Sequence, residues 1–212
     1  MKNVLYILVL LLITVSSCKK PMATVVYQDD LTTDNQTWLS DSTVYSVIKF
    51  DQGHYSIRVD SPNRITHTSA PYANINFPHT VQVDGTTVLD NTNQQGAIGI
   101  LFDQIDSIDY TVAEIWTNGT YRIWQKVNGL NSILVDFTYN TAIQTGSGSK
   151  NTIKVIQNKS DVEMVVNNIS MGIFTIPLPA QLVKTGPSVS TASALNFTPV
   201  TGLFNNFSIS KN

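Results

Sequence analysis

Short stretches in which apolar and polar residues alternate recur along this chain, and they constrain its fold more than any other feature. Alternation with a period of two puts successive side chains on opposite faces of a β-strand. No segment of eleven or more residues shows a helical period. We therefore expect the following strands: Thr24–Asp29, Val44–Phe50, His54–Val59, Asn63–Ser69, His79–Val83, Thr86–Asp90, Gly96–Phe102, Tyr110–Trp116, Thr120–Lys126, Ser132–Thr138, Asn151–Gln157, Asp161–Val166, Met171–Ile176, Pro187–Ala192 and Phe204–Ser210.

The segments between these strands carry residues that favour tight turns. Asn and Gly tolerate the positive φ angles that two-residue hairpins need. Many short strands joined by such turns are typical of an all-β sandwich or jelly roll of two antiparallel sheets. The expected turns are Asp51-Gln52-Gly53, Asp84-Gly85, Asn118-Gly119, Asn128-Gly129 and Asn167-Asn168.

The N-terminus has the pattern of an export signal. Lys2 precedes the apolar stretch Val4–Val15, which is too short to span a bilayer as a helix, since that takes about 20 residues. The residues Val15-Ser16-Ser17-Cys18 that follow resemble the bacterial lipobox. We therefore expect residues 1–17 to be a lipoprotein signal peptide, Cys18 to be lipidated, and residues 18–23 to form a tether.

The rest of the chain limits the partners. Cys18 is the only cysteine, so the mature chain is expected to fold without an intramolecular disulfide. The net charge of −2 offers no basic surface for nucleic acid. A region of the length of 24–212 suits a single all-β domain. The expected partners are a membrane, through the N-terminal lipid, and possible glycans.

Several short motifs resemble the concanavalin A-like lectin/glucanase superfamily, in its laminin-G-like branch that includes bacterial 3-keto-disaccharide hydrolase-like domains. The resemblance implies a concanavalin A-like jelly-roll β-sandwich whose first and last strands pair. Asn168 departs from the pattern, which has Gly there. The matching pieces are Gly96, Gly99 and Phe102; Tyr110; Asn118-Gly119 with Tyr121 and Ile123; Asn151, Ile153 and Val155; Val166-Asn167; Val26–Leu31; and Phe204–Phe207.

The catalytic acids of the glucanases in that superfamily have no counterpart here. Glycoside hydrolysis ordinarily uses two carboxyl groups about 5–9.5 Å apart. The chain has only two glutamates, Glu114 and Glu163, and neither belongs to an E-x-D-x-E cluster. We interpret Glu114 as a solvated strand carboxylate in preference to a solitary general base. The pattern leans towards a protein that is not an enzyme.

No dedicated metal or cofactor site is expected. His54, His67 and His79 lack the close spacing of a ligand pair. Calcium remains an open alternative at Asp103, Asp106 and Asp109, since this ion accepts scattered carboxylates. We favour a polar loop between strands at these three positions.

Aromatic residues on one predicted hairpin are the best candidates for a binding site. If Tyr121 belongs to the core, alternation turns Arg122 and Trp124 to the opposite face, as an exposed platform for a sugar ring. The resemblance implies that this is the concave, ligand-facing side. The alternative is that Trp124 packs under a neighbouring loop. The candidate ligand-binding residues are Trp124, Arg122, Trp116 and Glu114.

Together these patterns predict a lipoprotein of the bacterial cell envelope, anchored to the outer membrane, that acts as a non-catalytic carbohydrate-binding or accessory module. Two alternatives stay open: a glycoside hydrolase acting on 3-keto-disaccharides, which rests on resemblance alone, and a structural or adhesive surface protein. Asp41-Ser42-Thr43 and Asp106-Ser107-Ile108 resemble the O-glycosylation acceptor of Bacteroidetes.

Overall fold

The computed structural model describes residues 23–72, 75–177, 182–193 and 197–211. The predicted signal peptide, Cys18 and residues 19–22 of the tether lie outside the described residues. Within the described part the chain forms fifteen strands and no helix. It follows that no described helix is available to cross a membrane.

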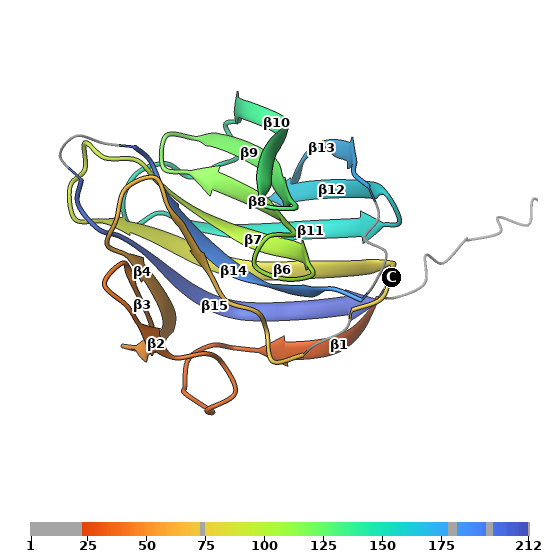
Figure 1. Ribbon diagram of the computed structural model, residues 1–212, viewed down its shortest axis with the longest axis horizontal. Coiled ribbons are helices and arrows are strands. Elements are labelled where there is room, and N and C mark those ends of the chain that lie inside the picture. Colours follow the sequence, from red (N-terminus) through yellow and green to blue (C-terminus); the bar gives the residue numbers. More distant parts are fainter. Residues whose placement is uncertain (1–22, 73–74, 178–181, 194–196, 212) are drawn as a thin grey trace, which may run out of the picture.

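Nine strands form the larger sheet, in which β15 lies between β6 and β4 and also pairs with β1 (Figure 1). Apart from β1, which pairs only with β15, the strands of this sheet follow the order β13-β12-β11-β6-β15-β4-β3-β2. Its strands are β1 (Thr24–Asp29), β2 (Asp41–Ser42), β3 (Ser46–Asp51), β4 (His54–Val59), β6 (His79–Leu89), β11 (Lys150–Asn158), β12 (Asp161–Val166), β13 (Ile169–Thr175) and β15 (Val200–Lys211).

Six strands form the smaller sheet, in the order β10-β9-β8-β7-β14-β5. All the strand pairs in both sheets are antiparallel, as hairpin-rich sequences favour. The strands are β5 (Ile65–His67), β7 (Gly96–Gln104), β8 (Tyr110–Trp116), β9 (Thr120–Val127), β10 (Leu130–Tyr139) and β14 (Lys184–Thr191).

The core lies between the inner faces of the two sheets. Its largest fully buried side chains include Tyr55 and Phe204 from the larger sheet and Phe102 from the smaller one. Trp38 also belongs to this core and is 4% exposed. Thr24 at the start of β1 pairs with Lys211 at the end of β15, as the family resemblance implied. The predicted all-β jelly-roll sandwich of two antiparallel sheets is confirmed.

One predicted turn is wrong. Asp84-Gly85 lies in the middle of β6, which runs unbroken from His79 to Leu89. Gly85 faces the core, where a Cβ atom would come within 2.7 Å of Ile98 Cδ1 and 3.2 Å of the Phe204 ring. The glycine therefore serves close packing between the sheets and not a reversal of the chain. The sequence patterns also missed the two-residue strand β2.

Gly186 in β14 is expected to be the less replaceable of two buried glycines. A Cβ there would meet the backbone oxygen of Thr68 at 2.0 Å, whereas the Cβ of Gly85 would meet the movable end of Ile98. Gly186→Ala should therefore destabilise the fold by about 1–3 kcal/mol and by more than Gly85→Ala. Denaturant unfolding of both variants measures the difference. Equal effects would contradict the close backbone approach at Gly186.

Candidate functional site

The outer face of the smaller sheet carries the predicted site residues. β8 and β9 are neighbours, and Glu114 faces Arg122 across the strand pair as Val112 faces Trp124. Tyr121 and Ile123 belong to the sandwich core, so Arg122 and Trp124 point outward, as alternation predicts. This face presents the side chains of Tyr110, Val112, Glu114, Trp116, Arg122, Trp124 and Lys126.

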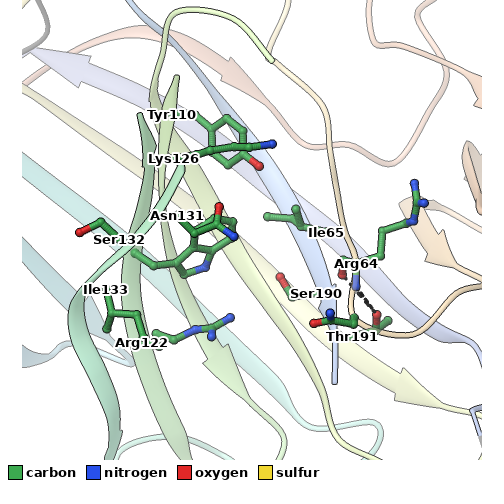
Figure 2. Close-up of a pocket in the computed structure, with 12 residues that line it drawn as sticks. Arg64, Ile65, Tyr110, Arg122, Lys126, Asn131, Ser132, Ile133, Ser190 and Thr191 are labelled. Carbon is green, nitrogen blue, oxygen red and sulfur yellow. Dashed lines mark hydrogen bonds between the residues drawn. The ribbon is translucent and has the colours of Figure 1, made fainter. Parts of the chain in front are cut away.

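A pocket of about 330 Å³ opens on this face. Figure 2 shows side chains of β9 and β10, among them Arg122 and Asn131, on one side of the pocket, and Ile65 and Ser190 from β5 and β14 on the other. The pocket thus bridges strands that are far apart in the sequence. Its lining is Asn63, Arg64, Ile65, Tyr110, Arg122, Trp124, Lys126, Asn131, Ser132, Ile133, Ser190 and Thr191.

Glu114 is fully buried, so its interpretation as a solvated carboxylate is wrong. Oε1 accepts hydrogen bonds from Arg122 Nε at 2.8 Å and Trp116 Nε1 at 3.1 Å, and Arg122 Nη2 lies 2.6 Å away. Oε2 accepts a hydrogen bond from Ser190 Oγ at 2.6 Å. Burial of a charge is tolerated here because both carboxylate oxygens are paired. Glu114 therefore holds neighbouring side chains in position and offers no unpaired oxygen.

Arg122 is held in place by aromatic rings as well as by Glu114. Its guanidinium carbon lies 4.6 Å from the ring centroid of Phe137, 5.5 Å from that of Trp116 and 5.7 Å from that of Trp124. Each is within the range of a cation–π interaction. Its charge is already neutralised by Glu114, so Arg122 contributes a rigid wall to the pocket.

Trp124 is turned away from the sandwich core but is only 8% exposed. The expectation of an exposed platform is wrong. The indole instead packs in a small apolar cluster with Leu101, Tyr110 and Val112, to which Ile65 adds. Its Nε1 is buried and has no hydrogen-bond partner among the described residues. Trp124 therefore forms an apolar wall of the pocket, and its enclosed Nε1 is not exposed to the hollow.

Two cationic residues of the pocket were missed by the sequence analysis as ligand-binding candidates. Arg64 lies over the Tyr45 ring at 4.0 Å, and Lys126 lies 5.8 Å from the Tyr110 ring centroid. Neither makes an ion pair with a described residue. Arg64 reaches the pocket because its backbone N–H donates to Thr191 Oγ1, which is 127 residues away in the sequence, a contact drawn in Figure 2. No local sequence pattern could indicate it.

The structure gives no support to the calcium alternative. Asp103 is buried and accepts a hydrogen bond from Gln157, whereas Asp106 accepts backbone N–H bonds within its own loop and Asp109 accepts one from Asn128. Each carboxylate thus has a different partner. Within the described ranges no three His, Cys, Asp or Glu side chains are grouped as metal ligands.

The three histidines are likewise separated. His54 is hydrogen-bonded to Asn205 through Nδ1, at 2.6 Å. Burial lowers the pKa of His67 and of His79 to about 4, so both rings are neutral at pH 7. His67 packs on Tyr110, with ring centroids 5.3 Å apart. The three histidines thus have different neighbours and do not form a common metal site.

Comparison with known proteins identifies the fold and not a family. No protein family and no curated protein matches the sequence. Solved structures with the same fold include the carbohydrate-binding module CBM66 from Bacillus subtilis, with a TM-score of 0.60 and 12% identity over 82% of this chain and 96% of that chain. The Bacillus licheniformis β-glucanase has a TM-score of 0.60 and 11% identity, over 88% of this chain and 98% of its own.

A third similar structure is the endo-β-galactosidase from Clostridium perfringens that releases GlcNAcα1-4Gal. It has a TM-score of 0.63 and 8% identity, over 91% of this chain and 64% of that chain. At such low identity these likenesses show an all-β jelly-roll sandwich and leave function to the residues of the site.

Proposed function

We propose that the protein is a carbohydrate-binding lipoprotein of the cell envelope whose ligand lies in the pocket on the outer face of the smaller sheet. The observation that carries the proposal is the composition of this pocket. Trp124, Tyr110 and Ile65 give it an apolar wall, and Asn131 and Ser132 add polar groups. Sugars need both, because their C–H faces pack on rings and their hydroxyl groups require hydrogen bonds.

Binding is favoured over hydrolysis by the distribution of acidic residues. All of the chain's Asp and Glu residues lie in the described ranges, and none of them lines the pocket. Glu114, directly beneath it, is bonded at both oxygens and has no second carboxyl group beside it. A hydrolase that uses a pair of carboxyl groups would need two within about 5–9.5 Å.

Trp124→Phe is expected to weaken glycan binding by about fivefold to tenfold, because the smaller ring removes apolar surface from the pocket wall on which the sugar packs. The smaller ring keeps most of the packing against Tyr110, so the melting temperature should fall little compared with that of Trp124→Ala, which removes a buried indole at about 3–5 kcal/mol. Isothermal titration with the glycan selected on an array measures the affinity.

Gln82→Ala, on the outer face of the larger sheet, is the matched control and should bind as the unaltered protein does. An array on which the folded protein retains no glycan would contradict the proposed function. Unchanged affinity of Trp124→Phe would instead contradict the assignment of the ligand to this pocket.

The lipid anchor rests on the sequence Val15-Ser16-Ser17-Cys18 after an apolar stretch. Cys18→Ser is expected to abolish lipidation, because the modified atom is the cysteine sulfur, and to leave the protein unprocessed or out of the outer-membrane fraction. Labelling with a radioactive fatty acid and cell fractionation measure both effects. A Cys18→Ser protein that is still cleaved and membrane-bound would contradict the anchor.

A further inference from the structure

We propose that the pocket selects acidic sugars, that Lys126 binds the anionic group, and that Arg64 adds positive charge at the rim. This inference rests on the proposed function and specifies its ligand class. The two cations come from different segments: Arg64 directly precedes β5, and Lys126 lies on β9. Figure 2 shows them on opposite sides of the hollow, with Lys126 beside Tyr110 and the Arg64 side chain extending outward from the rim.

The charge of the pocket is the first observation. Arg64, Arg122 and Lys126 line it together with no acidic side chain, in a protein whose net charge is −2. Glu114 neutralises Arg122 from beneath. Arg64 and Lys126 have no such partner in the described part of the chain. The pocket therefore carries uncompensated positive charge where the ligand would lie.

The way these two cations are held is the second observation. Tyr45 lies 4.0 Å from the Arg64 guanidinium and Tyr110 lies 5.8 Å from the Lys126 ammonium. A ring restrains a cation without neutralising it. The Arg64 backbone is fixed by bonds of its N–H and its C=O to the Thr191 hydroxyl. The side chains are thus restrained and remain able to pair with an anion.

The hydrogen-bonding character of the pocket is the third observation. The charged side chains that line the pocket belong to Arg64, Arg122 and Lys126, and arginine and lysine side chains are hydrogen-bond donors only. A ligand that completes this pocket must supply acceptor oxygens. A uronate carboxylate or a sugar sulfate does so and carries the complementary charge.

The test compares acidic sugars with neutral ones of the same skeleton. Titration calorimetry would use oligogalacturonate and oligomannuronate beside their methyl esters, and dextran sulfate beside dextran. We expect the acidic member of a pair to bind at least about tenfold more tightly, with an affinity that falls as salt is raised. If only the uronates are preferred to their esters, the anionic group that the pocket binds is a carboxylate. If only dextran sulfate is preferred to dextran, that group is a sulfate.

Lys126→Met and Arg64→Gln should each reduce that preference by about fivefold or more, since each removes one cation and keeps a side chain of similar length. Lys154→Met, on the outer face of the larger sheet, makes the same change of charge away from the pocket and should have no effect.

Equal affinity for acidic and neutral sugars would overturn this inference and leave the proposed function standing. The inference would also be overturned if the three variants lost affinity equally, or if a single-stranded oligonucleotide bound as tightly as the acidic sugars, since both indicate nonspecific attraction of polyanions. Absence of binding to every glycan would overturn the proposed function itself.

Discussion

Glu114→Ala is expected to destabilise the folded protein by about 3–5 kcal/mol, because it leaves Arg122 without its partner beside a fully buried position. Trp116 Nε1 and Ser190 Oγ lose their acceptor in the same step. The variant also loses the contact that joins β8 to β14 across β7. Urea unfolding followed by circular dichroism measures the change in free energy.

A double-mutant cycle separates the ion pair from the loss of packing. Arg122→Met keeps the aliphatic stem among Trp116, Trp124 and Phe137 while removing the charge. The double variant should be more stable than the sum of the two single losses predicts, because it leaves no charge unpaired. Strict additivity would contradict the view that Glu114 and Arg122 act as a pair.

Asp103 is expected to contribute a loss of stability as the pH rises from about 4 to 7, opposite in sign to the gain that His67 and His79 contribute over this range because burial lowers their pKa to about 4. Burial raises the pKa of Asp103 from its ordinary value of 3.8 to about 7, although a hydrogen bond from Gln157 lowers it in part. Between these two values the folded state holds a proton that the unfolded state has released. The proton on Asp103 therefore contributes its full stabilisation below pH 3.8, and this contribution is lost as the pH passes 7. The loss amounts to at most roughly 4 kcal/mol.

The hydrogen bonds of Asp103 agree with a neutral side chain. Oδ2 accepts from Gln157 Nε2 at 2.9 Å, whereas Oδ1 and Gln157 Oε1 are both buried without a donor. A proton on Oδ1 makes that atom a donor, and the unpartnered Oε1 belongs to the same neighbouring side chain. The proton also removes the negative charge that burial would otherwise leave on this side chain.

Asp103→Asn should remove the Asp103 contribution, so its stability should rise more steeply between pH 4 and 7 than that of the unaltered protein, and it should be more stable than the unaltered protein at pH 8. Asparagine is a neutral substitute that also tolerates the φ of 53° at this position. Thermal unfolding between pH 4 and 8 gives the slope for both proteins, and a carboxyl ¹³C titration gives the pKa directly. Equal slopes in the two proteins, with the Asp103 carboxyl titrating near 4, would contradict the prediction.

Local patterns predicted most of the fold, because alternation and turn chemistry are properties of neighbouring residues. The bounds of β4 (His54–Val59) and β8 (Tyr110–Trp116) are those expected from alternation alone. Asp84-Gly85 was wrongly predicted to be a turn, because in the sequence a glycine that permits close packing between sheets cannot be told from one that permits a turn. Its role depends on Phe204, more than a hundred residues away in the sequence.

Only part of the candidate site could be predicted, again because sequence patterns report on neighbouring residues. The β8–β9 hairpin is local, so alternation correctly placed Arg122 and Trp124 on the outer face. The burial of Glu114 was not predictable, because Ser190 is 76 residues away. The cationic side of the pocket depends on Arg64 meeting β14, which only the assembled sheet brings about.

The position of β15 controls the order in which the chain can fold. This strand, the last in chain order among those described, lies between β4 and β6 and also pairs with β1. Until residues 200–211 are available, β4 and β6 have no common partner and the larger sheet stays open. Pairings between such distant segments slow folding. A chain with this topology therefore completes its larger sheet only once its final described strand has paired.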